Sequence, residues 1–258
     1  MSGELVQILE GNTFVVSDTR GDIEASRTDP TGLFSFDTRF LSRWVLTVDG
    51  NRLNALSTDD LQYFESRFFL VPGTGTVYVD SKLSVIRRRA VADGFHEELS
   101  ILNHDEEAVD LEVRLEAGSD FADLFEVKDA LKKKGKYENR VEDGRLVLGY
   151  RRDTYRRETW ISATAPAAVD GKGLTFSVHL EPHGEWMTEL NVSAVNASWG
   201  EALEQAGDEQ RRKRGRPSMA RGLDKWLARA PQLECDWDPL RATYRRSLVD
   251  LAALRFST

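Results

Sequence analysis

The chain has 258 residues, enough for one large domain with a sizeable buried core. Its formal net charge of -8 disfavours nonspecific nucleic-acid binding, because an acidic surface repels phosphates. The single cysteine, Cys235, excludes an internal disulfide and a cysteine zinc cluster, which fits a cytoplasmic location. No apolar run approaches the roughly 20 residues that span a bilayer, and residues 1–5 lack a secretory signal, so we expect no membrane contact and no secretion.

Apolar and polar residues alternate in short runs up to about residue 195, which is the period of half-buried strands. The clearest runs are 44–48, 109–117, 146–150, 174–180 and 186–192, and we expect the last two to pair with each other. Asp49-Gly50 and Asp143-Gly144 favour tight hairpin turns. The sequence therefore predicts a mainly β chain, a large antiparallel β-sandwich (supersandwich) with C-terminal linker helices.

The composition changes after Gly200. Residues 201–210 are polar and acidic, residues 211–217 are basic, and residues 219–230 have the pattern of a helix that stops before Pro231. We therefore expect a β-supersandwich domain over residues 1–198 and a linker with a helix over residues 199–236.

The last segment has the pattern of an amphipathic helix that needs a partner to pack against. Asp238 is a suitable N-cap and Pro239 suits the first helical turn. One face carries an apolar stripe, formed by Leu240, Tyr244, Leu248 and Leu251. Residues 237–258 are thus predicted to start a helical domain, of which only the first helix is present. The stripe also leaves open self-association between chains.

Charged and aromatic residues are interleaved over residues 32–44. Asp37 and Arg39 lie two apart on an expected strand, so they share a face and could pair with each other or with neighbours across the sheet. One interpretation is a structural ion pair at a strand end. The other is a polar loop that faces sugar hydroxyls, with aromatic rings alongside.

A second cluster, residues 120–127, follows an expected strand and contains Asp120, Phe121 and Asp123. Glycoside hydrolysis needs two opposed carboxyl groups about 5–10 Å apart across the scissile bond. Sequence proximity does not supply that geometry, so the pattern favours a solvated or capping role. We predict no catalytic residue in this chain. Asp37, Arg39, Asp120, Phe121 and Asp123 are the candidates for facing a cleft or binding a substrate.

No motif indicates a metal or a cofactor. His179 and His183 have the spacing of a helical zinc site, but Pro182 and Gly184 disfavour a helix there. Gly73-Thr74-Gly75 lacks the third glycine and the helix of a phosphate loop. We expect neither a metal nor a cofactor.

One basic segment argues for a different class of protein. Arg214-Gly215-Arg216-Pro217 has the extended basic form that enters the minor groove of A·T-rich DNA. A single copy in an acidic chain more often forms a solvated linker, so nucleic acid is disfavoured as a partner.

A set of motifs in one order resembles a known family. The motifs are Glu10–Phe14, Asp18–Ile23, Gly32–Phe34 with Asp37–Ser42, Arg87–Arg89, Asp93-Gly94 and Asp120–Val127. They resemble the N-terminal domain of bacterial and archaeal glycogen-debranching enzymes of the amylo-alpha-1,6-glucosidase type. The closing Arg246–Leu254 segment looks like the entry helix of that family's catalytic domain.

The resemblance implies a β-supersandwich that is followed, in full-length relatives, by an α/α barrel carrying the catalytic carboxylates. We expect this chain to stop where that barrel would begin, so no acid or base residue of the family is carried over. The resulting hypothesis is a noncatalytic accessory domain that supports the barrel of a debranching-type glucosidase and its glucan cleft, with no hydrolysis by the chain alone.

Two alternatives stay open. The first is a free-standing glucan-binding module, in which exposed aromatic residues among Trp44, Phe121, Trp160 and Trp186 would stack on sugar rings. The second is a DNA-associated protein that acts through Arg214–Pro217.

Overall fold

The computed structural model describes residues 4–26, 30–73, 82–91, 94–196 and 219–254, and these residues form two antiparallel sheets and three helices. The small sheet has the order β1 (Val6–Glu10), β2 (Thr13–Ser17), β4 (Gly32–Ser35) and β5 (Thr38–Leu41). The large sheet has the order β12 (Lys136–Glu142), β13 (Arg145–Arg152), β14 (Tyr155–Ala163), β17 (Glu185–Asn196), β10 (Phe95–Asn103), β9 (Leu83–Val91), β8 (Glu65–Pro72), β7 (Asn51–Gln62), β6 (Arg43–Val48), β11 (Val109–Gly118), β16 (Gly173–Leu180) and β15 (Ala168–Asp170), and β3 (Ile23–Glu24) pairs with β6. The helices are α1 (Leu124–Lys128), α4 (Met219–Arg229) and α5 (Asp238–Ala253).

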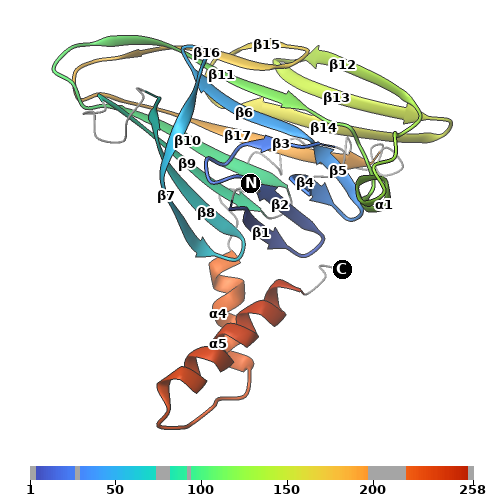
Figure 1. Ribbon diagram of the computed structural model, residues 1–258, viewed down its shortest axis with the longest axis vertical. Helices are drawn as coiled ribbons and strands as arrows, with labels where there is room; N and C mark the ends of the chain where they lie inside the picture. Colours follow the sequence, from blue (N-terminus) through green and yellow to red (C-terminus); the bar gives the residue numbers. More distant parts are fainter. Residues whose placement is uncertain (1–3, 27–29, 74–81, 92–93, 197–218, 255–258) are drawn as a thin grey trace.

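The large sheet turns back on itself through the long strand β7, which runs from β6 down to β8 (Figure 1). The two halves of the sheet therefore face each other across the core. Trp44 on β6 meets Phe95 on β10 edge to face, with ring centroids 5.6 Å apart. Phe176 on β16 meets Trp186 on β17 in the same way at 5.3 Å. The fold class is confirmed as mainly β, with a sandwich-like core.

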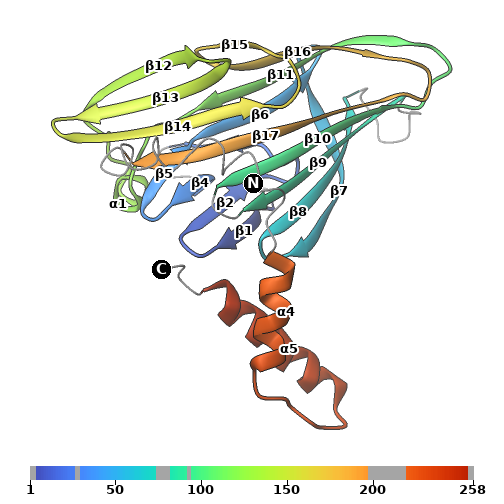
Figure 2. The same ribbon diagram turned by 180° about the vertical axis from the view of Figure 1, so that it is seen from behind.

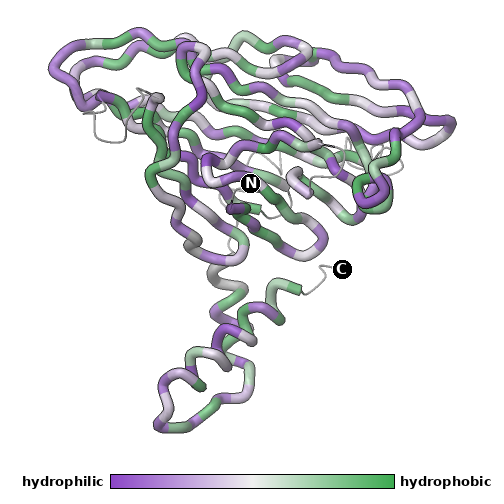
Figure 3. The backbone as a smooth tube through the Cα atoms, in the orientation of Figure 1, coloured by the Kyte–Doolittle hydropathy of each residue, from purple (hydrophilic) through white to green (hydrophobic). Residues whose placement is uncertain are grey.

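The alternation of apolar and polar residues in the sequence matches the alternation of buried and exposed side chains along the strands. Along β11, Leu111, Val113 and Leu115 are buried and the residues between them are partly or fully exposed. The tube in Figure 3 alternates between hydrophobic and hydrophilic colours along many strands for the same reason. The predicted strands β6, β11, β13, β16 and β17 are confirmed.

The expected pairing of β16 with β17 is wrong. β16 pairs with β11 and β15, and β17 pairs with β10 and β14. The short connection between β16 and β17 carries the chain from one half of the sheet to the other, so the two strands meet through side chains across the core.

Both predicted Asp-Gly turns close hairpins. Asp49 and Gly50 have φ of 50° and 74°, and they join β6 to β7 where Val48 pairs with Asn51. Asp143 and Gly144 have φ of 49° and 74° and join β12 to β13. Two successive residues with positive φ match the twist of the flanking strands, which aspartate and glycine tolerate well.

Gly173 is the glycine with the closest approach to neighbouring backbone. A Cβ atom there would lie 2.0 Å from the carbonyl oxygen of Leu115, and φ is +157°. We expect Gly173→Ala to lower the free energy of unfolding by about 2 kcal/mol, because the backbone of β11 would have to move away from the added Cβ atom. Denaturant unfolding checks this. Gly171→Ala, whose nearest atom is Asn139 Cβ at 3.8 Å, is the control and should be near neutral. Equal losses in both variants would contradict the steric argument.

The two predicted C-terminal helices are present and project from the lower side of the sandwich (Figures 1 and 2). They pack on each other and on the β7–β8 turn through a small cluster formed by Phe64, Leu223 and Ala252 with Tyr63, Trp226, Leu227 and Val249. The N-cap of α5 is Trp237, with no side-chain cap, so the expected N-cap Asp238 is wrong by one residue; Asp238 pairs with Arg241 instead.

Leu240 and Leu251 of the predicted stripe are exposed, because α5 meets α4 through Val249 and Ala252. Among the described residues, no helix is long and apolar enough to cross a membrane.

Candidate functional site

The candidate site residues from two distant segments come together at one edge of the small sheet. The Arg39 N–H donates to the Ala122 carbonyl at 2.8 Å, and the Leu124 N–H donates to the Asp37 carbonyl at 2.9 Å. Thr38 forms a bridge with Asp123. We call residues 36–39 and 120–131 the α1 edge. The structure thus places Asp37, Arg39, Asp120, Phe121 and Asp123 in one neighbourhood.

A buried arginine anchors the α1 edge. Arg39 is 1% exposed, and its guanidinium donates to both carboxylate oxygens of Asp120, with Nε at 3.0 Å and Nη2 at 2.5 Å. Nη1 also donates to the Thr31 carbonyl at 3.2 Å. Asp37 does not pair with Arg39; its carboxylate accepts from the Thr38 hydroxyl at 3.0 Å and is exposed. A two-point contact of this kind fixes the position of the Asp120 carboxylate.

Asp123 has the expected capping role. Its carboxylate accepts from the Glu126 N–H at 2.8 Å, and the Glu126 carboxylate accepts from the Asp123 N–H at 2.9 Å, which is a capping box at the start of α1. The Lys133 ammonium donates to Glu126 at 2.7 Å. Asp120 and Asp123 are therefore both engaged in holding the local structure.

Phe121 is part of the core. It is 1% exposed, meets Phe40 edge to face at 5.8 Å and stacks on Tyr150 at 5.8 Å. Trp44 is fully buried as well. Trp160 and Trp186 are half-buried, and they are covered by the Arg145 guanidinium and the Phe176 ring respectively. These rings leave little open face for stacking on sugar.

Two other aromatic side chains of the α1 edge are open to solvent. Phe36 is 66% exposed and Phe125 is 73% exposed, and Leu124 and Leu131 beside them are exposed too. Tyr137 lies nearby, where its hydroxyl donates to the Asp120 carbonyl at 3.0 Å. Burial, together with the Asp120 carboxylate, raises the pKa of Tyr137 to about 12. No sequence pattern distinguishes the exposed rings of Phe36 and Phe125 from the buried ring of Phe121.

A buried ionic cluster in the sandwich core was missed by sequence reasoning. Glu97 on β10 accepts from Arg87 Nε at 3.0 Å and from Arg89 Nη2 at 2.5 Å, and Arg87 Nη1 donates to Asp22 at 2.7 Å. The four side chains are almost completely buried. Arg89 also lies between the rings of Phe68 and Phe95, at 5.1 and 5.0 Å from their centroids.

The carboxylates of this cluster stabilise the charge on Arg87, whereas burial, with repulsion from Arg87, lowers the pKa of Arg89. Burial favours neutral Glu97, but the two arginines outweigh burial and hold the pKa of Glu97 below its usual value. Burial likewise opposes the charge on Arg87, yet Glu97 and Asp22 raise the pKa of its guanidinium. Since all four members are at most 4% exposed, we assign the cluster a structural role.

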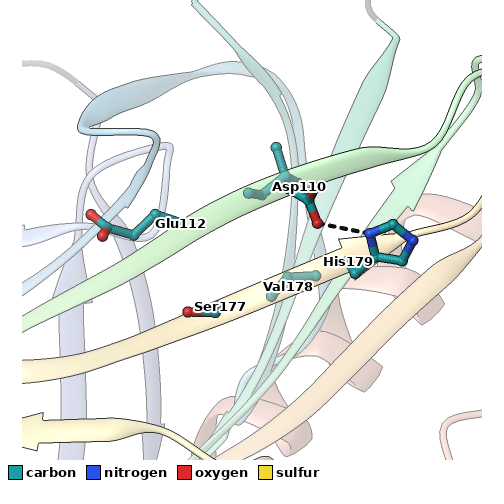
Figure 4. A pocket seen from close by; sticks show the side chains of 6 residues that line it. Asp110, Glu112, Ser177, Val178 and His179 are labelled. Carbon is teal, nitrogen blue, oxygen red and sulfur yellow. Dashed lines mark hydrogen bonds and ion pairs between the residues drawn. The ribbon is translucent and has the colours of Figure 1, made fainter.

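A shallow surface depression lies over β11 and β16 (Figure 4). His179 Nδ1 and Asp110 Oδ1 are 2.7 Å apart there, and this contact raises the pKa of His179. Both side chains are exposed, and His183 lies separately, 3.4 Å from Glu106. In the part of the chain that the structure describes, no group of three metal-ligating side chains is placed to hold a metal ion.

The sequence matches the N-terminal domain of (some) glycogen debranching enzymes over residues 8–191. The chain belongs to this family. The match covers both sheets and the α1 edge. A comparison with curated proteins finds no match.

One solved structure with a TM-score above 0.5 resembles this debranching-enzyme domain in fold. A protein from the human microbiome described as a kojibiose phosphorylase has a TM-score of 0.62 at 10% identity; the similarity covers 96% of this chain and 39% of that chain. The debranching-enzyme domain therefore spans less than half the length of that protein. An Escherichia coli K12 protein described as an aldose 1-epimerase has a TM-score of 0.44 at 9% identity, covering 75% of this chain and 99% of that one.

Proposed function

We propose that this debranching-enzyme N-terminal domain is a noncatalytic β domain that supports an α/α barrel of a debranching-type glucosidase and helps to shape its glucan cleft. The observation that carries the proposal is the family match over residues 8–191. The barrel would supply the catalytic carboxylates. A cytoplasmic location goes with this proposal, as does the division into residues 1–198, 199–236 and 237–258.

The geometry of the α1 edge favours a noncatalytic role for this domain. Glycoside hydrolysis needs one carboxyl group as acid and a second as nucleophile or base across an open cleft. Asp120 is held by Arg39, and Asp123 caps α1. Asp37 is the carboxylate of the set that these two structural contacts do not engage, and one carboxylate does not complete such a pair. Contact of Asp37 or Asp123 with glucan stays a prediction.

The exposed side of α5 also supports the proposal. Trp237 at its N-cap, Leu240, Leu251 and Leu254 present apolar side chains to solvent. Exposed apolar groups along one helix are typical of a surface that another element covers. A helical domain that begins with α5 would cover this side.

Release of reducing sugar from glycogen limit dextrin and pullulan tests the proposal. The chain is compared with the same chain joined to a helical barrel domain. We expect hydrolysis only by the joined protein. Hydrolysis by the chain alone, or none by either protein, would refute the proposal.

The alternative of a free glucan-binding module is less well supported, because Trp44 and Phe121 are buried. We expect the chain alone to migrate through glycogen-containing gels at its ordinary rate. The basic segment Arg214–Pro217, on which the DNA alternative depends, lies outside the described residues.

A further inference from the structure

The α1 edge presents an apolar surface to water. Phe36 lies in the β4–β5 turn and Phe125 in the first turn of α1, and the hydrogen bond from Leu124 to Asp37 joins the two segments. Leu124 and Leu131 extend the surface. Two neighbouring phenylalanines that are 66% and 73% exposed are unusual for a surface that stays in water, because each ring would be stabilised by burial.

The backbone of the same edge is strained. Phe36, Phe121 and Ala130 have φ of 53°, 48° and 53°, in the left-handed region. Among the described residues, the other non-glycine residues with positive φ are Asp49, Asp143, Asp153 and His183, which are types that adopt this conformation more readily. Strain in bulky residues persists where the surrounding structure enforces it and concentrates at functional surfaces.

Hydrogen bonds and ion pairs hold the backbone of the α1 edge in place. Arg39 fixes Asp120, the capping box fixes the start of α1, and Lys133 fixes Glu126. The exposed rings therefore sit on a preorganised support, which lowers the entropic cost of binding a partner.

The position and charge of the edge indicate its partner. The β4–β5 turn and α1 lie below β12, β13 and β14, on the side of the molecule from which α4 and α5 project (Figures 1 and 2). Helix α5, on which Leu240 and Leu251 are exposed, lies on that side as well. The α1 edge contains five acidic residues against two basic ones, Arg39 and the exposed Lys128, so its net charge is negative. A helix with an apolar face bordered by arginine or lysine complements such a surface.

We infer that the α1 edge is a docking surface for an apolar helix face, bordered by arginine or lysine, in the helical domain that the proposed function requires. This inference rests on the proposed function and adds a second contact to the one made by α5. Phe36 and Phe125 are its central side chains, since large aromatic residues dominate such contacts.

The test measures how fast a maleimide labels a cysteine placed at the edge. Cys235→Ser removes the native thiol, and Lys128→Cys places a reporter on the exposed side of α1. We expect labelling about tenfold slower in the protein joined to its helical domain than in the chain alone. Phe36→Asn with Phe125→Gln should restore fast labelling in the joined protein. Asparagine tolerates positive φ, so the lone chain should lose no stability through residue 36.

The control reporter is Leu56→Cys on β7, at the opposite side of the molecule from α1 (Figure 1), which should label equally fast in both proteins. Equal labelling of the Lys128→Cys variant in both proteins, with glucan hydrolysis intact in the joined one, would overturn the docking surface and leave the proposed function standing. Slow labelling of the lone chain that dilution relieves would assign the surface to a second copy. Slowing that appears only when glucan is added would assign it to substrate. Either result would also overturn the inference.

Discussion

Replacing Glu97 with glutamine is expected to lower the free energy of unfolding by about 3–5 kcal/mol. Glu97 is 1% exposed and accepts hydrogen bonds from both Arg87 and Arg89. Glutamine would leave two buried guanidinium groups with only the Asp22 carboxylate to balance them. Removal of one partner from a buried ionic cluster costs far more than the cluster itself contributes, because the remaining charge stays desolvated. Denaturant unfolding at neutral pH measures the loss.

The same substitution should change the response to acid. The pKa of Glu97 is held below its usual value near 4.5. The folded chain therefore binds a proton at Glu97 less readily than the unfolded chain does. The stability that Glu97 contributes is complete above about pH 4.5 and is lost as the pH falls through the lowered pKa. The difference in unfolding free energy between wild type and Glu97→Gln should shrink over that acidic range.

Glu98→Gln is the matched control. Glu98 is the next residue on β10, and its side chain lies on the opposite face of the strand and is partly exposed. Its substitution should change stability by less than about 0.5 kcal/mol. A loss at Glu97 no larger than the loss at Glu98 would show that the cluster is not needed for stability.

The sequence predicted the strands because each has one buried and one wetter face. β11 and β16 follow the alternation almost residue by residue. The Asp-Gly turns were predictable for a local reason too, since the φ values they adopt are set by the two residues themselves. Strand order was not predictable in this way. The choice of β10 and β14 as partners of β17 depends on contacts between residues far apart in sequence.

The buried ionic cluster escaped prediction because charged residues in an alternating strand normally mark the wet face. Arg87 and Arg89 share the inward face of β9 with Val85 and Val91, and this shared face was the available signal. What makes the burial of two arginines tolerable is Glu97 on the neighbouring strand. Nothing in the spacing of the sequence identifies that partner.

The candidate site was predictable as a neighbourhood but not in its details. The motifs that resemble the debranching family located Asp37, Arg39, Asp120 and Asp123. The pairing of Arg39 with Asp120 joins residues 81 positions apart, so spacing does not reveal it. Whether Phe121 or Phe125 is buried depends on where the single turn of α1 begins, which the Asp123 cap decides.

Asp120→Asn is expected to lower the free energy of unfolding by about 2 kcal/mol, the range of a hydrogen bond to a charged group. Asparagine keeps the size of the side chain and one acceptor oxygen, but it removes the charge that faces the buried Arg39 guanidinium. The loss should exceed that of Arg39→Met, since that variant removes the buried charge and leaves Asp120 partly hydrated, with its side chain 39% exposed. Thermal and denaturant unfolding of the purified variants give the ranking.

Asp123→Asn serves as the comparison within the same segment. Asparagine caps a helix about as well as aspartate, so α1 should keep its start and stability should change little. An equal loss of unfolding free energy in Asp123→Asn and Asp120→Asn would show that the Arg39–Asp120 contact stabilises the fold no more than the cap does. If Asp120→Asn were neutral while it weakened glucan binding by the protein joined to its barrel, Asp120 would be a substrate contact rather than an anchor. The stability ranking therefore separates the two roles that the sequence left open for this cluster.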